Sequence, residues 1–237
     1  MRPWSPIPIR ECGEPLVPLP PQLLRLEPHP YQALGAPYGN QGCPFRLRRG
    51  VVQRLLRAQE HLVALAPGRR LAIFDAWRPL AVQRFMVAHA FAEECQVRGL
   101  DPALDGPGQR AVRQEVGRFW APPSDDPAMP PPHSTGAAVD LTLADAAGHP
   151  LAMGGDIDAI GPVSEPDHYA GAAASDPGGS AAGFDAHRRL LQRVMAEAGF
   201  ARHPNEWWHF SHGDQLWAWS GGGPEACYGR VPEALPA

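Results

Sequence analysis

The sequence predicts an α+β fold in which helices flank a small sheet, formed as a single domain over residues 1–237. Apolar residues recur with helical periodicity between residues 49 and 65, which gives that segment one buried stripe. Two other runs are typical of strands, a short apolar one over 71–74 and an alternating one over 139–143. Together these segments predict a mixed architecture of helices and short strands.

Composition restricts the classes of partner. Hydrophobic residues make up 44% of the chain and charged residues 19%, which is ordinary for a globular protein. With 29 Pro and 25 Gly, much of the chain must form turns and loops. The formal net charge of −4 gives no electrostatic reason to expect nucleic acid or an anionic membrane as partner. We therefore expect a small substrate, and the sequence leaves the oligomeric state open.

Cysteine spacing and the chain start both favour a cytoplasmic location. Cys12, Cys43, Cys95 and Cys227 form no Cys-x-x-Cys pair, so we expect reduced thiols and neither a zinc knuckle nor a disulfide framework. Residues 1–10 contain no uninterrupted apolar run of the roughly 7–15 residues that a secretory signal needs. No stretch approaches the ~20 apolar residues of a membrane helix.

The remaining elements follow from helix and turn signals. Residues 1–46 are Pro-rich, and we expect them to wrap irregularly over the core. Pro79 is expected to open a helix that runs to about residue 98, and a weaker helix is expected over 109–120. Residues 144–183 show little periodicity and predict a long loop.

The last quarter of the chain predicts one more helix and a hairpin. Asp185 is expected to cap a helix that ends at Gly199. Strands are expected over 206–211 and 215–219, and the tail from residue 221 is expected to be loose.

The segment with the most chemical information lies between residues 132 and 143. It contains His133 and Asp140, seven residues apart, with a turn at Gly136 between them, and a second imidazole follows at His209. Two His and one Asp match the three protein ligands of a catalytic zinc site, whose fourth position is left to water.

Burial costs support this interpretation, although each residue alone has a simpler explanation in packing or surface exposure. Asp140 lies in a β-prone run, and Glu206 and His209 lie beside two Trp, so both segments would bury charge that one cation could stabilise. Positions i and i+3 point to opposite faces of a regular strand. We therefore expect Glu206 at a bend and His209 alone on the strand proper.

Arg78 is a further candidate because it lies between the 71–74 strand and the helix that follows. The backbone on both sides would hold its cation in place. A surface Arg paired with Asp75 is the simpler alternative, and spacing alone favours that alternative.

Three motifs resemble a known family. His-x-x-Gly-x-Ala-x-Asp over 133–140, Glu-x-Trp-His over 206–209 and Asp-x-x-Arg-Pro over 75–79 resemble the D-alanyl-D-alanine dipeptidases, which include the vancomycin-resistance dipeptidases. The resemblance covers about residues 30 to 219. It implies the α+β fold of the zinc D,D-peptidases, with a small central antiparallel sheet, and hydrolysis of D-alanyl-D-alanine to D-alanine.

The resemblance also implies roles for individual residues. His133, Asp140 and His209 would bind one zinc ion, Glu206 would act as general base, and Arg78 would stabilise the transition state.

Substrate contacts are implied for two more residues. Asp158 would meet the substrate ammonium, and Tyr31 would match a substrate-contacting Tyr of the family. Many members have Ser where this chain has Pro131, which removes one hydroxyl contact. The exact dipeptide and the biological role (antibiotic resistance, wall recycling or nutrition) remain open.

Two alternatives use the same residues. A D,D-carboxypeptidase or endopeptidase acting on peptidoglycan peptides would be favoured by export and an open cleft. A non-catalytic zinc-binding module of the same fold is the other, and the presence of Glu206 and Arg78 together argues against it.

Overall fold

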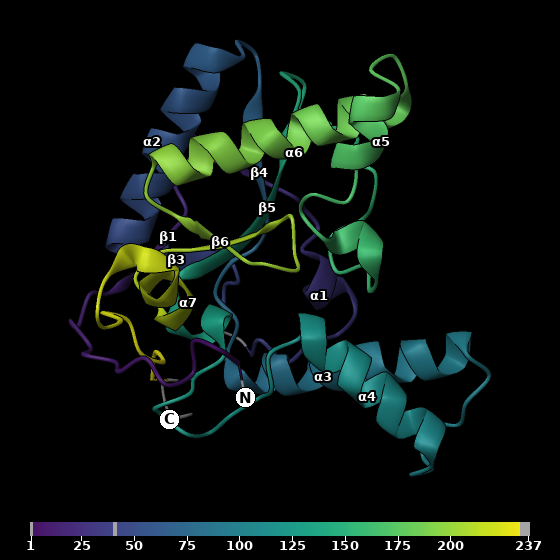
Figure 1. Cartoon of the computed structure of the whole chain (residues 1–237). Helices are drawn as coiled ribbons and strands as arrows, with labels where there is room; N and C mark the ends of the chain where they lie inside the picture. Colours follow the sequence, from purple (N-terminus) through teal and green to yellow (C-terminus); the bar gives the residue numbers. More distant parts are fainter. Residues whose placement is uncertain (1, 40–41, 233–237) are drawn as a thin grey trace.

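A mixed sheet forms the centre of the computed structural model, which describes residues 2–39 and 42–232 (Figure 1). Five strands pair in the order β2-β4-β5-β7-β6, and β1 pairs with β3 beside them. The strands are β1 Leu16–Pro18, β2 Leu24–Arg25, β3 Arg46–Arg48, β4 Arg70–Asp75, β5 Ala138–Ala144, β6 Ala201–Arg202 and β7 His209–Ser211. All neighbours in the five-stranded sheet are antiparallel except β2 and β4, which are parallel. The predicted fold class is confirmed, and the parallel edge strand is an addition to it.

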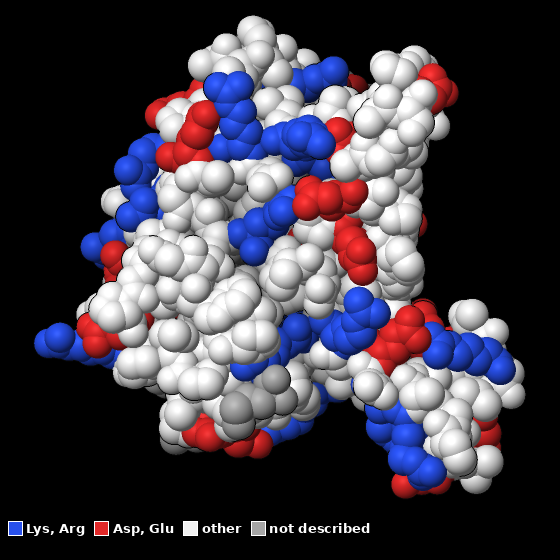
Figure 2. All heavy atoms as spheres, in the orientation of Figure 1, with Lys and Arg blue, Asp and Glu red and all other residues white. Residues whose placement is uncertain are grey.

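Helices pack around this sheet. They are α1 Pro30–Ala33, α2 Arg49–Leu65, α3 Leu80–Val97, α4 Pro107–Phe119, α5 Ala170–Ser175, α6 Ser180–Glu197 and α7 Gln215–Trp217, with short turns η1 Pro132–Thr135, η2 Pro162–Ser164 and η3 Ala218–Gly222. In Figure 1, α2 and α6 cover one side of β4 and β5, while α3 and α4 lie together at the other end of the molecule. Figure 2 shows that this α3–α4 pair stands out from the body and that charges of both signs intermix on the visible face. Within the described residues, no helix is both long enough and apolar enough to cross a membrane.

β5 is buried on both faces, which explains how a charged side chain comes to lie at the centre of the molecule. All seven of its residues are buried. Leu141 and Leu143 pack in one apolar cluster with Leu55 of α2 and Leu191 of α6. A second apolar cluster joins α3 and α4 to the segment around α1. Asp140 therefore lies on a covered face, where it needs a partner.

Several predicted elements are correct. The helix over 49–65 is α2, and the predicted strands at 71–74 and 139–143 are β4 and β5 with slightly wider bounds. α3 begins at Leu80 with Pro79 as its N-cap residue, one position later than predicted, and α4 spans 107–119.

The predicted start of the last long helix is wrong. α6 begins at Ser180 after Gly179, and Asp185 lies inside it, where its carboxylate accepts a hydrogen bond from Arg189 at 2.6 Å. Ala181 and Ala182 favour helix, so helix formation starts before Asp185. The predicted long loop over 144–183 also contains α5 and η2, whose exposed faces left no periodic signal.

The predicted strand over 215–219 is also wrong, because this segment is helical. Asp214 caps α7, with its carboxylate accepting a hydrogen bond from the Trp217 N–H at 2.9 Å. The tail is not loose near its start, because Ala226 forms a bridge with Ile9 and the carbonyl of Gly229 accepts a hydrogen bond from Arg48. For residues 233–237 the prediction lies outside the described residues.

Candidate active site

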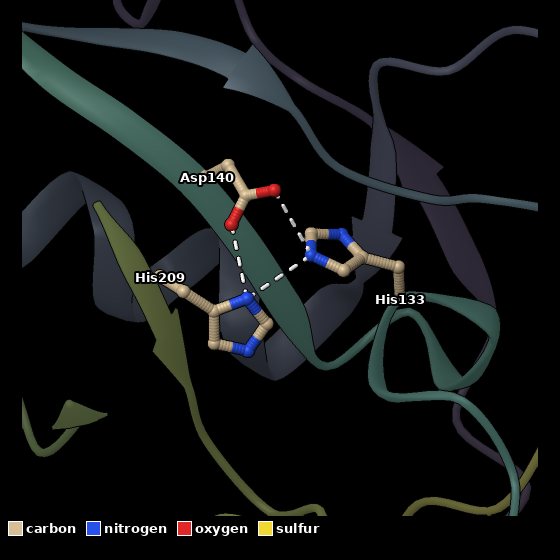
Figure 3. Close-up of side chains that lie close together, drawn as sticks. All are labelled: His133, Asp140 and His209. Atoms are coloured by element: carbon tan, nitrogen blue, oxygen red, sulfur yellow. Dashed lines mark hydrogen bonds and ion pairs between the residues drawn. The ribbon is translucent and has the colours of Figure 1, made fainter. Parts of the chain in front are cut away.

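Three buried side chains from separate segments converge on one point (Figure 3). His133 Nε2 lies 3.2 Å from His209 Nδ1 and 3.2 Å from an Asp140 carboxylate oxygen, and the other oxygen lies 3.0 Å from His209 Nδ1. None of the three side chains is more than 4% exposed as a residue. These are the three residues for which the sequence predicts a shared metal ion.

Sheet register brings two of these residues together. In the antiparallel pairing of β5 and β7, Asp140 lies directly opposite His209. On the other side of β5, after a bulge in β4, Asp75 lies opposite Asp140. One row across the sheet therefore carries two carboxylates and an imidazole.

His133 reaches the row through a tight turn. It lies in η1, and the following Gly136 has a φ of +71° and donates its N–H to the His133 carbonyl at 3.2 Å. A Cβ at Gly136 would overlap the side chain of Leu16, so glycine is required there by both backbone and space. The backbone N–H of Arg78 also bonds the His133 carbonyl, at 3.3 Å.

The donor set fits a zinc ion. His133 Nδ1 lies 2.7 Å from the Ala76 carbonyl, so Nδ1 carries the hydrogen and the lone pair of Nε2 faces the cluster. Metal bonds of about 2.0–2.1 Å in a tetrahedral site place ligand atoms about 3.3 Å apart. The separations of 3.0–3.2 Å among the two nitrogens and the Asp140 oxygens are close to that value. Burial opposes ionisation of Asp140, but the neighbouring imidazoles hold its pKa well below the usual range.

Glu206 lies beside this cluster. β7 begins at His209, so Glu206 precedes the strand, between a turn at 204–205 and a bend at 207–208, and its Oε2 lies 3.7 Å from His209 Nδ1. The expected bend is present and lets the two side chains converge. Burial raises the pKa of Glu206 well above its usual range, and the charge of Asp140 adds to the effect. His203, for which the sequence predicts no role, places its Nδ1 3.5 Å from Glu206 Oε1.

Arg78 is buried, so the surface alternative is wrong, although its pairing with Asp75 is correct. Its guanidinium donates to Asp75 Oδ2 at 2.7 and 3.1 Å and to Gln83 Oε1 at 2.9 Å. The rings of Tyr31 and Trp120 each lie 5.0 Å from its Cζ. Burial disfavours the charge, but Asp75 outweighs it and raises the pKa of Arg78 further. The structure thus holds a permanent cation with its plane and position fixed.

Asp75 has more partners than the sequence indicates. It also contacts His29 Nε2 at 3.1 Å and accepts from the Tyr38 hydroxyl at 3.3 Å. Burial would raise the pKa of Asp75, but Arg78 and the His29 hydrogen bond lower it to about 2. The Pro-rich N-terminal segment supplies both of these new partners, and nothing in its sequence marks them.

Tyr31 and Asp158 form a pair at the same site. The Tyr31 hydroxyl donates to Asp158 Oδ2 at 2.6 Å and accepts from Arg78 Nη2 at 3.3 Å. Asp158 has a φ of +68°, a conformation that non-glycine residues seldom adopt. Burial raises the pKa of Asp158 to about 7, and the charge of Asp140 contributes.

A cavity joins most of these residues, with about 480 Å³ of free space including solvent at its mouth. Its lining includes His133, Asp140, Asp158, Glu206, His209 and Arg78, together with Arg2, Trp4, Gln83, Trp120, His203 and Trp208. Pro132 contributes to the wall, whereas Pro131 does not. Arg2 and Trp4 carry no sequence signal for this site, because they lie more than 100 residues from every predicted metal ligand. His203 does have a sequence signal, because it lies only three residues before Glu206.

Comparisons with known proteins identify the family of this chain. The peptidase M15 family model, described as D-ala-D-ala dipeptidase, matches residues 25–221. A D-alanyl-D-alanine dipeptidase of Synechocystis is 44% identical over 226 residues, covering 92% of this chain and 90% of that protein. Another from Streptomyces coelicolor is 35% identical, over 65% of this chain and 67% of that protein. Among solved structures, a mutant of the vancomycin-resistance D,D-pentapeptidase VanY in complex with Zn(II) aligns with a TM-score of 0.45 and 16% identity, covering 93% and 96% of the two chains. On the extent of the family match and the identity to the Synechocystis protein, the chain belongs to the D-Ala-D-Ala dipeptidase family of peptidases.

Proposed function

We propose that this protein hydrolyses D-alanyl-D-alanine to two molecules of D-alanine, using one zinc ion held by His133, Asp140 and His209. The observation that carries the proposal is the set of three buried donors 3.0–3.2 Å apart with a second carboxylate, that of Glu206, beside them. The names of the curated relatives supply the substrate.

The protein's own residues divide the chemistry between them. Zinc, when bound, would supply Lewis-acid polarisation and lower the pKa of water at the site. Glu206 accepts a proton from the attacking water and later gives it to the leaving amine nitrogen. Arg78 stabilises negative charge that develops on the carbonyl oxygen, because its guanidinium lines the cavity and is already fixed by Asp75 and Gln83.

Asp158 is proposed to bind the substrate ammonium. Its carboxylate is half-buried in the cavity wall and is oriented by the Tyr31 hydroxyl. A free dipeptide offers an ammonium there, whereas a longer wall peptide offers a neutral amide. This contact favours the dipeptidase over the carboxypeptidase alternative, and a comparison of D-Ala-D-Ala with N-acetyl-D-Ala-D-Ala tests the choice.

Glu206→Gln tests the chemistry. We expect D-alanine release to fall about 10²–10⁴-fold, the usual contribution of a general base, while zinc content stays at one per chain. Glu93→Gln is the matched control, because its side chain is 64% exposed and pairs with His89. Near-normal turnover by Glu206→Gln with zinc bound would remove the proposed base, and failure of the unmodified protein to release D-alanine would remove the proposed function.

A further inference from the structure

The N-terminal segment, defined here as residues 2–10, forms part of the wall of the catalytic cavity. The side-chain amide of Gln215 donates to the carbonyls of Ser5 and Ile7 at 3.0 and 2.6 Å. Trp4 is 6% exposed, with its ring centre 5.4 Å from that of His203. The segment is therefore held against the body by hydrogen bonds and packing, and both Arg2 and Trp4 face the cavity.

Arg2 is fixed by the end of a helix. Its Nη1 donates to the carbonyl of Arg118 at 3.0 Å and its Nη2 to that of Gly117 at 3.3 Å. These carbonyls belong to the C-terminal end of α4, where the helix dipole favours a cation. Two of the five guanidinium N–H groups are used in this way, and the others remain available.

No carboxylate forms an ion pair with Arg2 within residues 2–39 and 42–232. Burial lowers the pKa of Arg2, and Glu206 is the charge that acts in the opposite sense. Arg2 is partly buried without a carboxylate beside it, and an anionic ligand would reduce the cost of that burial.

His203 provides a second donor at the same place. The backbone N–H of Asn205 donates to His203 Nδ1 at 3.3 Å, which places the ring hydrogen on Nε2. His203 Nε2 lies 3.4 Å from Arg2 Nη1, so two donors face each other without an acceptor between them. One carboxylate in the cavity could accept from both.

The position of this donor pair matches one end of the proposed substrate. Glu206 gives its proton to the leaving nitrogen, and in a dipeptide one carbon separates that nitrogen from the free carboxylate. His203 links Arg2 to Glu206, since its Nδ1 lies 3.5 Å from Glu206 Oε1. The ammonium site at Asp158 instead contacts Tyr31. The cation is thus on the Glu206 side, where the carboxylate must lie.

We propose that Arg2, with His203 Nε2 beside it, binds the free C-terminal carboxylate of the dipeptide. This inference rests on the proposed function, and it assigns substrate specificity to the N-terminal segment. Trp4 lines the same cavity beside Arg2.

The test compares a free carboxylate with its amide. Full-length protein with a C-terminal tag is assayed on D-Ala-D-Ala and on D-alanyl-D-alaninamide, as wild type, Arg2→Gln and Arg10→Gln. Arg10 is the matched control because it lies in the same segment with its side chain 82% exposed. We expect Arg2→Gln to lower kcat/KM for the free acid about 10- to 100-fold, mainly through KM, and to leave the amide nearly unchanged. Arg10→Gln should change neither.

If Arg2→Gln lowers kcat/KM equally for the acid and the amide, Arg2 only caps α4 and the proposal fails. An unchanged preference for the free acid in Arg2→Gln would also overturn the proposal. If the wild type hydrolyses neither compound, the proposed function fails, and calorimetric binding then decides the role of Arg2 separately. Carboxylate binding by Arg2 is supported if the wild type binds the acid more tightly than the amide and Arg2→Gln loses this difference. Equal binding of the acid and the amide by the wild type would refute it.

Discussion

Replacing Asp75 by Asn should lower the free energy of unfolding by more than the loss of an exposed ion pair does. Asp75 is fully buried and joins Arg78, His29 and Tyr38 through contacts of 2.7 to 3.3 Å. Asn keeps the shape but leaves the Arg78 guanidinium buried without its main counter-charge. Breaking a buried pair in this way costs about 3–5 kcal/mol. We expect a loss of that order in the free energy of unfolding, measured by urea denaturation.

Asp125→Asn is the matched control. Asp125 pairs with Arg84 at 2.5 Å, but the two side chains are 74% and 49% exposed, so the expected loss is about 0–1 kcal/mol. D-alanine release per folded molecule should also fall in Asp75→Asn alone, because Arg78 loses the partner that orients it. A loss of stability below about 1 kcal/mol in Asp75→Asn would refute the view that this pair organises the site.

Three further changes have defined outcomes. Burial lowers the pKa of His212 to about 4, whereas an unfolded His titrates near 6.5, so the unfolded chain binds more protons between these values and stability falls as pH drops through that range. In His212→Asn the side-chain amide can still donate to the Gly199 carbonyl, as His212 Nδ1–H does. The free energy of unfolding, measured by urea denaturation, should then change less between pH 5 and 7. An unaltered dependence on pH would contradict this. Gly136→Ala should lower the free energy of unfolding by about 1–3 kcal/mol and should also lower zinc content. The reason is that alanine is strained at a φ of +71° and its Cβ would displace Leu16. Normal metal binding and stability in this variant would exclude this role for the turn. Chelation should abolish D-alanine release and added zinc should restore it, and activity that survives complete removal of metal would end the metal assignment.

The convergence of His133, Asp140 and His209 could be predicted from sequence because a buried charged or polar side chain without a partner is costly. Asp140 interrupts an apolar strand, and His209 with Glu206 adjoins two Trp, so both segments required a common partner. The bend at Glu206 followed from strand geometry alone, and the structure has it. Local rules were sufficient where the relevant residues lie on regular strands.

Prediction failed where long-range contacts determine the structure. The segment over 215–219 alternates like a strand, but Asp214 caps it as a helix, and within the described residues it pairs with no strand. Arg2 carries no local signal, because its environment is made by the C-terminal end of α4 and by His203. Such residues are identified by the cavity that they line rather than by their neighbours in sequence.

Charge balance in the cavity favours a zwitterionic substrate. With every carboxylate counted as ionised and every histidine as neutral, the cavity lining has three carboxylates and two guanidiniums, and Asp75 pairs with Arg78 behind them. The sum is −2 for Asp75, Asp140, Asp158, Glu206, Arg2 and Arg78. One divalent cation held by the proposed donors would balance this sum, and a free dipeptide adds no net charge. An N-acylated peptide adds −1 and leaves Asp158 without an ammonium, in a place where burial already raises its pKa to about 7. The site should therefore discriminate between peptides by charge as well as by length. Asp158→Asn should lower the ratio of kcat/KM for D-Ala-D-Ala to kcat/KM for its N-acetyl derivative. A ratio that stays the same would place the ammonium elsewhere.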